Sequence, residues 1–263
     1  MGDRLKDVVA VVVGAGTSAP GLGIGQAIAR LFAQEGAKLV LVDLHEDRGL
    51  ETQRLIAEEG GESIVVAANL ADPAGCEAVA EAARNTYGAV SVLVNNAAYT
   101  PLLSVEETSH EVFTKVLDVN ITGPFLMIKA LLPGMIERGG GSIVNIGSVS
   151  AIRSSTGRQT AYASSKAALL GLMVDVANGY GQHGVRINTV SPGMIDTPLR
   201  RQTMRDMGYD PDAYPFGTAS SMGHAGDGWD IAKAALFFAS DDSRFVTGVH
   251  MPVDGGLTTR QPT

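Results

Sequence analysis

The sequence predicts an α/β protein built on a doubly wound parallel sheet, and three observations support this fold class. Short apolar, β-branched runs alternate with stretches in which apolar residues recur at helical spacing. Runs that are apolar throughout suit strands buried on both faces of a parallel sheet. A glycine-rich segment directly follows the first run, where such sheets commonly bind phosphate. Strand–helix alternation without a linker or repeat predicts a single domain over residues 1–263.

Each element follows from its local pattern. The apolar runs predict strands, in chain order, at residues 8–13, 38–42, 63–67, 90–94, 142–146 and 186–190. After Gly23, apolar residues from Ile24 to Phe32 fall at i, i+3, i+4, i+7 and i+8, one face of a helix. The same spacing in 76–83 and 231–238 predicts two more helices. The stretch at 198–228 is irregular, and its length favours a functional lid.

Composition narrows the class of protein. A net charge of −8 and a pI near 5.1 argue against a nucleic-acid or anionic-membrane surface. Cys76 is the only cysteine, which excludes an internal disulfide and favours the reducing cytoplasm. The first apolar run is too short to cross a bilayer. None of the histidines pairs at ligand spacing, so we expect no metal.

The segment "GAGTSAPGLGIG", from Gly14 to Gly25, joins the first strand to the first helix. Free N–H groups at a helix start favour a pyrophosphate, and glycines let it approach the backbone. Taken alone, an ordinary glycine-rich turn explains the segment equally well. Asp43, at the end of the second strand, can accept both ribose hydroxyls and repel a 2′-phosphate. Arg48 offers a cation, although a solvated helix position is favoured for it. The residues therefore favour NAD over NADP.

In the second half of the chain, four residues together form a candidate proton relay. "YASSK" places Tyr162 and Lys166 on one helix face, and an adjacent ammonium is expected to lower the phenol pKa from near 10. Ser148 follows a strand at the ligand-binding edge. Pro124 lacks the N–H that would bond the Asn120 carbonyl, which leaves that carbonyl free to hold a water. Taken singly, each has a structural explanation: Tyr162 and Lys166 are four apart by chance, Ser148 caps a helix, and Asn120 lies at a helix kink. Together, behind a nucleotide loop, they predict acid–base chemistry.

These motifs resemble the short-chain dehydrogenase/reductase family from Val8 to Gly256. The family's catalytic tetrad maps onto Asn120, Ser148, Tyr162 and Lys166, and its "NNAG" turn onto "NNAA" from Asn95. The resemblance implies a seven-stranded Rossmann fold and reversible hydride transfer between NAD and an alcohol or ketone. With the loop pattern, it implies cofactor contacts at Gly14, Thr17, Ser18, Gly23, Ile24, Asp43, Asn69, Leu70, Asn95, Ala97, Tyr162, Lys166, Pro192, Ile195 and Thr197.

The chain departs from the family pattern in places. Val13 and Ala98 replace the family's usual Thr and Gly, and Asn69 replaces an Asp whose adenine contact we expect to survive. Eight residues separate Gly14 from Gly23, against three in the family, so five are extra. If these are residues 17–21, Gly16 and Gly21 are turn formers, and Thr17 or Ser18 replaces the hydroxyl lost at Val13. Enoyl reductases also carry a longer loop, but they space Tyr and Lys farther apart, so we set that branch aside.

The substrate is only outlined. The lid is rich in apolar and adaptable residues, which suits a mid-sized hydrophobic or cyclic secondary alcohol: Leu199, Met204, Met207, Tyr209, Tyr214 and Phe216. Arg153 could meet a carboxylate or sulfonate, although a solvated arginine is favoured. An NADPH-dependent 3-oxoacyl-type carbonyl reductase and a non-catalytic nucleotide-binding scaffold remain alternatives. The helix carrying Tyr162 is apolar on more than one face, and the resemblance implies a homotetramer.

Overall fold

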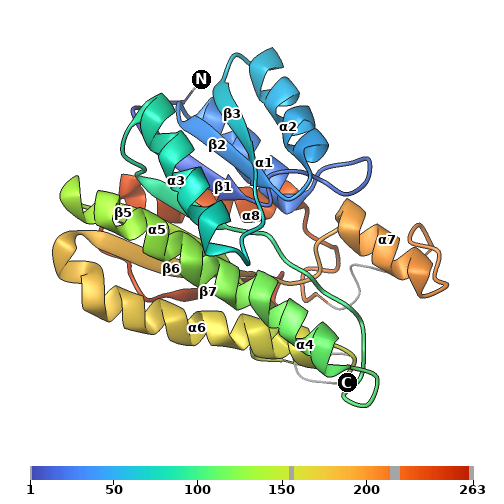
Figure 1. Ribbon diagram of the computed structural model, residues 1–263. Helices are drawn as coiled ribbons and strands as arrows, with labels where there is room; N and C mark the ends of the chain where they lie inside the picture. The colour runs from blue at the N-terminus through green and yellow to red at the C-terminus, as the bar shows by residue number, and fades with distance from the viewer. Residues whose placement is uncertain (1, 154–156, 214–219, 261–263) are drawn as a thin grey trace.

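The computed structural model describes residues 2–153, 157–213 and 220–260. Its centre is one sheet of seven parallel strands in the order β3-β2-β1-β4-β5-β6-β7 (Figure 1). The strands are β1 (Val9–Val13), β2 (Lys38–Asp43), β3 (Glu62–Ala67), β4 (Val92–Asn95), β5 (Gly141–Ile146), β6 (Val185–Pro192) and β7 (His250–Val253). The predicted doubly wound, seven-stranded Rossmann fold is confirmed.

Helices cover both faces of the sheet, as the uninterrupted apolar strands require. Alternate residues of β1 enter opposite cores: Ala10 and Val12 pack toward one face, and Val11 and Val13 toward the other. The first face carries α1 (Ile24–Gln34), α2 (Glu46–Glu58) and α8 (Gly228–Ala239). The second carries α3 (Pro73–Tyr87), α5 (Gly123–Glu137) and α6 (Thr160–Tyr180). The order of strands reverses between β1 and β4, which is where ligands bind in such sheets.

The stretch expected to be an irregular lid contains a helix that its apolar pattern did not predict. Helix α7 (Pro198–Asp206) opens this segment, with Thr197 as its N-cap and Pro198 in its first turn. It projects beyond the carboxyl edge of the sheet (Figure 1). The expectation of an irregular stretch is therefore wrong for residues 198–206, because a capping threonine and an N-terminal proline start a helix without apolar periodicity. Tyr214 and Phe216 lie outside the described residues.

One helical stretch is long and apolar enough to cross a membrane by length and composition alone. It runs from His110 to Glu137 through α4 (His110–Leu117), a π-helical turn η1 (Asp118–Thr122) and α5. Met127, Ile128 and Leu131 of this stretch are buried in the core on the second face of the sheet. The core packing of α5 accounts for its apolar character.

Candidate active site

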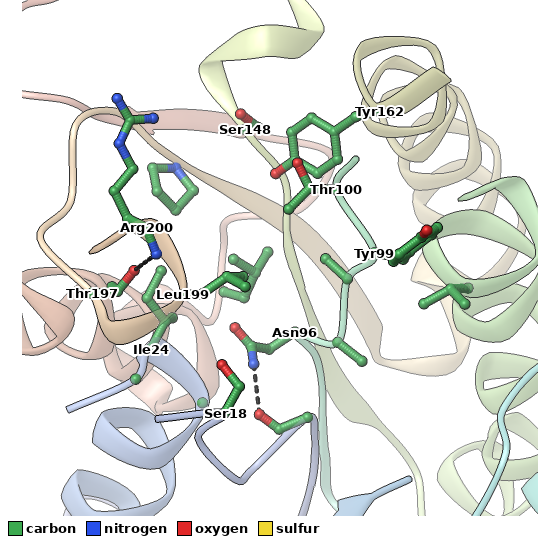
Figure 2. Close-up of a pocket in the computed structure, with 18 of the residues that line it drawn as sticks. Ser18, Ile24, Asn96, Tyr99, Thr100, Ser148, Tyr162, Thr197, Leu199 and Arg200 are labelled. Carbon is green, nitrogen blue, oxygen red and sulfur yellow. Dashed lines mark hydrogen bonds between the residues drawn. The ribbon is translucent and has the colours of Figure 1, made fainter. Parts of the chain in front are cut away.

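A cavity of about 1150 Å³ opens at the carboxyl ends of β1, β4 and β5, at the point where the strand order reverses. Figure 2 shows part of its wall, with Ser18 and Ile24 at one end and Ser148 and Tyr162 at the other. The cavity brings together nearly all the residues expected to bind a cofactor or substrate: Gly14, Thr17, Ser18, Gly23, Ile24, Asp43, Asn69, Leu70, Ala97, Ser148, Tyr162, Lys166, Pro192, Ile195 and Thr197. Two expected residues, Asn95 and Asn120, are not on its wall.

The turn between β1 and α1 has the shape of a phosphate cradle. Helix α1 begins at Ile24, and its N-cap Gly23 is extended and makes no side-chain cap, so side chains leave the first amides unused. A Cβ on Gly14, whose φ is +70°, would lie 2.7 Å from Ala97 Cα. A Cβ on Gly25 would lie 1.9 Å from the Gly14 carbonyl oxygen. Only glycine fits at both positions, and the uncapped helix start suits the pyrophosphate of a dinucleotide.

The longer loop differs in detail from the expectation. Gly16 is not a left-handed turn residue; its N–H donates to Asp43 Oδ2 over 3.1 Å, and an added Cβ would lie 2.4 Å from Arg48 Cβ. Thr17 Oγ1 donates to the Ala19 carbonyl, so its hydroxyl makes a hydrogen bond within the extension. Gly21 is a turn former, with φ of +122°, and it faces Pro198 at the start of α7. The extension therefore connects the cofactor loop to the lid.

Asp43 sits at the end of β2 with both carboxylate oxygens bonded to backbone. Oδ2 accepts from Gly16 N and Oδ1 from His45 N, each over 3.1 Å. These bonds fix the carboxylate at the end of the cavity where adenosine is expected, with spare lone pairs that can accept hydroxyl hydrogens. Arg48, expected to be a solvated helix residue, is half-buried and lies on the same wall.

The two asparagines of "NNAA" divide their work. Asn95 is buried, and its Nδ2 donates to Asn145 Oδ1 on the neighbouring strand over 2.9 Å. Asn96 reaches across to the glycine loop, and its Nδ2 donates to the Gly14 carbonyl over 2.8 Å (Figure 2). Asn96, absent from the expected residues, thus holds the loop, while Asn95 braces β4 against β5. Strand alternation was the available signal, because Asn95 is the last residue of β4 and lies on the same face as Leu93, whereas Asn96 already belongs to the following turn.

Tyr162, Ser148 and Lys166 meet at the inner end of the cavity. Ser148 follows β5 and lies beside the Tyr162 phenol on the cavity wall (Figure 2), where its hydroxyl helps to lower the phenol pKa. Its Oγ also accepts from Ser150 N over 3.1 Å, which fixes the side chain. Lys166 Nζ lies 5.7 Å from the centre of the Tyr162 ring and donates to the Ile146 carbonyl over 2.7 Å. The helical spacing of Tyr162 and Lys166 therefore produces the expected convergence.

The electrostatics of this corner differ from the sequence expectation. Burial raises the pKa of Tyr162 above its usual range, and the hydrogen bond from Ser148 offsets only part of that rise. Burial also lowers the pKa of Lys166 to about 8. The expectation that Lys166 lowers the phenol pKa is thus wrong for this arrangement, since removing both groups from water disfavours both charges. The corner stores a proton on the phenol at neutral pH.

Asn120 acts one step behind the cavity. It is fully buried in the π-helical turn η1. Pro124 has no N–H to donate to the Asn120 carbonyl, as expected, and the helix departs from α-helical bonding at this point. Its side chain clamps the Tyr99 backbone, accepting from Tyr99 N over 2.8 Å and donating to Tyr99 O over 3.0 Å. It also donates to Ser165 Oγ, next to Lys166. The side chain of Asn120 therefore ties α6 to the cavity wall at Tyr99.

The remaining expected contacts lie after β6. Pro192, Ile195 and Thr197 all line the cavity, and the Thr197 hydroxyl accepts from Arg200 N at the start of α7. Among the residues that the structure describes, no three His, Cys, Asp or Glu side chains gather as a metal site.

Comparison with known proteins places this geometry in a family. Residues 19–258 match the family model described as Enoyl-(Acyl carrier protein) reductase. The chain is 35% identical to 2,5-dichloro-2,5-cyclohexadiene-1,4-diol dehydrogenase LinX of Sphingobium indicum, covering 97% of this chain and 98% of that one. It is 35% identical to 2-(S)-hydroxypropyl-CoM dehydrogenase 3 of Xanthobacter autotrophicus, over 98% and 99% of the two chains.

A solved structure agrees. The crystal structure of a Burkholderia xenovorans protein assigned to the short-chain dehydrogenases/reductases superposes with a TM-score of 0.92 at 36% identity, covering 99% of this chain and 100% of that one. The fold and site define a nicotinamide-dependent oxidoreductase. This chain belongs to the short-chain dehydrogenase/reductase family.

Proposed function

We propose that the protein is an NAD-dependent dehydrogenase that oxidises a mid-sized hydrophobic or cyclic secondary alcohol to a ketone, in a reversible reaction. The observation that carries the proposal is the contact of Ser148 with the Tyr162 phenol on the wall of a cavity that also contains the glycine loop. Two similar proteins are named as dehydrogenases of a cyclic diol and of a hydroxypropyl compound, which supports a secondary carbinol.

In this mechanism NAD supplies the hydride acceptor, and the chain's residues handle the proton. Ser148 holds the substrate oxygen beside Tyr162. The phenol first gives its own proton to the path toward solvent and then takes the hydroxyl proton of the alcohol. Lys166 binds the nicotinamide ribose and, with Asn120, positions the phenol and its path to solvent. In the reverse direction the protonated phenol, which burial favours, donates to the carbonyl oxygen.

NAD is favoured because the fixed Asp43 carboxylate would lie against a 2′-phosphate. Arg48 on the same wall favours the second candidate, an NADPH-dependent 3-oxoacyl-type reductase. The deciding experiment measures NAD and NADP reduction over a panel of secondary alcohols, polyols and dihydrodiols. Oxidation with NAD supports the proposal. Preference for NADP would favour the reductase, and absence of turnover with both would favour a non-catalytic scaffold.

We also propose that the protein acts as a homotetramer in the cytoplasm. Phe125 on α5 and Val174 on α6 are exposed, and Phe245 before β7 is completely so. Apolar side chains on neighbouring helices suit contact with another copy of the chain. Light scattering at micromolar concentration should give a mass of four chains, and a monomer would contradict the assembly.

A further inference from the structure

The charge of the cavity opposes that of the molecule. The chain carries 28 acidic and 20 basic residues, yet five cations line the cavity against one carboxylate among the described residues. That carboxylate is Asp43, which sits at the adenosine end with both oxygens bonded to backbone amides. Three of the cations, Lys115, Arg153 and Arg200, come from elements that surround the proposed substrate end. Within the described part of the wall, no acidic side chain at that end offsets Lys115 or Arg153.

Arg153 is held in place without being neutralised. It lies five residues after Ser148, and its Nη1 donates to the backbone carbonyls of Leu257 and Arg260. Both acceptors are uncharged, and no described carboxylate forms an ion pair with Arg153. Its Nε and Nη2 have no hydrogen-bond partner among the described residues. A guanidinium anchored by one nitrogen thus keeps three N–H donors for a ligand.

The wall beside Arg153 also presents donors. Ser150 N donates to Ser148 Oγ, and Ser150 Oγ donates to Gln159 Oε1 over 3.0 Å. This bond orients the amide of Gln159, whose Nε2 has no hydrogen-bond partner among the described residues. Gln159 lies three residues before Tyr162 and lines the cavity. Arg153 and Gln159 therefore place N–H donors on the same cavity wall as Ser148 and Tyr162.

Lys115 adds a second charge at the cavity mouth. Its Nζ lies 5.0 Å from the centre of the Tyr99 ring, and the Tyr99 backbone is clamped by Asn120. No described carboxylate lies within ion-pair distance of Lys115 either. Because Lys115 is exposed, salt screens it more strongly than the half-buried Arg153.

We propose that the substrate carries an oxyanion group, a carboxylate or a sulfonate, which Arg153 and Gln159 bind while the carbinol faces Ser148 and Tyr162. A planar guanidinium pairs with such groups through parallel N–H bonds, and an amide N–H adds a third. The apolar residues Leu199 and Met207 of the lid side then contact the carbon skeleton. The inference rests on the proposed dehydrogenase function and makes Arg153 a specificity-determining residue.

Matched substrates test the proposal. NAD reduction is measured with 2-, 3- and 4-hydroxypentanoate, with the amide of each, and with 3-hydroxybutane-1-sulfonate. We expect kcat/KM for at least one hydroxypentanoate to exceed that of its amide by roughly tenfold or more, the scale of a charged hydrogen bond. The KM of the anion should rise with salt, whereas the KM of the amide should not.

Variants locate the effect. Arg153→Met should lower kcat/KM for the anion roughly tenfold to a hundredfold and leave the amide nearly unchanged. Arg153→Lys should recover part of the loss. Lys233→Met, which removes an exposed charge on α8 outside the cavity wall, is the matched control and should change neither.

Equal use of acids and amides, or an equal loss of both in Arg153→Met, overturns the inference and leaves the dehydrogenase function standing. If no alcohol is oxidised with NAD or NADP, the proposed function fails, and calorimetric titration with 4-hydroxypentanoate and 3-hydroxybutane-1-sulfonate decides the anion site. Saturable binding that Arg153→Met weakens supports the site. Absence of binding, or identical binding by the variant, overturns it.

Discussion

The two ends of the cavity are built on opposite principles. At the inner end, Ser148 and Lys166 are buried and Tyr162 is partly buried, and desolvation shifts the pKa values of Tyr162 and Lys166. At the outer end, Asp43 and the extension at 17–21 are open to solvent or half-buried, and backbone amides fix the Asp43 carboxylate. Desolvation magnifies the consequence of changing a single group, and solvent reduces it. The effects of substitution should therefore be large at the inner end and small at the outer one.

The largest effect is expected at Tyr162. Tyr162→Phe removes the proton carrier but keeps the ring, so turnover should fall at least about 100-fold while NAD binding stays near normal. Steady-state kinetics and a fluorescence titration with NAD measure the two quantities. Near-normal turnover would mean that another group moves the proton and that Tyr162 has only a packing role.

The next largest effect is on stability, at Lys166. Burial places the pKa of Lys166 at about 8, against 10.5 for an ordinary lysine. Between these values the unfolded chain holds a proton that the folded protein has lost, so stability rises with pH in this window. Relative to Lys166→Met, the wild-type free energy of unfolding should increase by about 1.4 kcal/mol for each pH unit from 8 to 10. Denaturant unfolding of both proteins measures this difference. Parallel curves would show that Lys166 keeps its ordinary pKa.

A smaller effect is expected at Asp43. Asp43→Ala should weaken NAD roughly tenfold, because ribose loses a charged acceptor, and should narrow the preference for NAD over NADP. Asp43→Asn keeps an acceptor without the charge and separates the two causes. Dissociation constants for both cofactors provide the measurement. If the wild-type protein already prefers NADP, then Arg48 rather than Asp43 determines the choice of cofactor.

The smallest effect is expected from deleting residues 17–21, which leaves "GAGLGIG" and the cradle formed by Gly14, Gly23 and the start of α1. A lost hydroxyl contact amounts to about 0.5–1.5 kcal/mol, so NAD should bind roughly tenfold more weakly or less. Calorimetry on the folded deletion variant measures the constant, with Thr17→Val as the control for the hydroxyl alone. A loss beyond about a hundredfold would show that the extension itself forms the phosphate cradle.

The local pattern of the chain was sufficient for much of this architecture. Apolar runs located the strands because a strand buried on both faces needs no polar alternation, and β1 through β6 lie within two residues of the predicted runs. The first helix begins at Ile24, directly after the glycines. Helical spacing alone placed Tyr162 and Lys166 together, since residues four apart share a helix face.

Other features depend on segments far apart in the sequence. Gly16 owes its role to Arg48 and Asp43, and Asn95 owes its position to Asn145, fifty residues away. The helix at Pro198–Asp206 is started by a cap and a proline without apolar periodicity. Arg153 looked like a solvated side chain until the fold brought the carbonyls of Leu257 and Arg260 to it.

The sequence by itself determined the fold class, the glycine-rich turn between β1 and α1, and the position of Tyr162 and Lys166 on one helix face, because periodicity, turn chemistry and spacing are properties of neighbouring residues. Only the tertiary structure decided the protonation of Tyr162 and Lys166 and the charge of the substrate end. Both depend on how completely distant segments exclude water and on which partners they bring, and desolvation reverses the effect expected from a nearby ammonium.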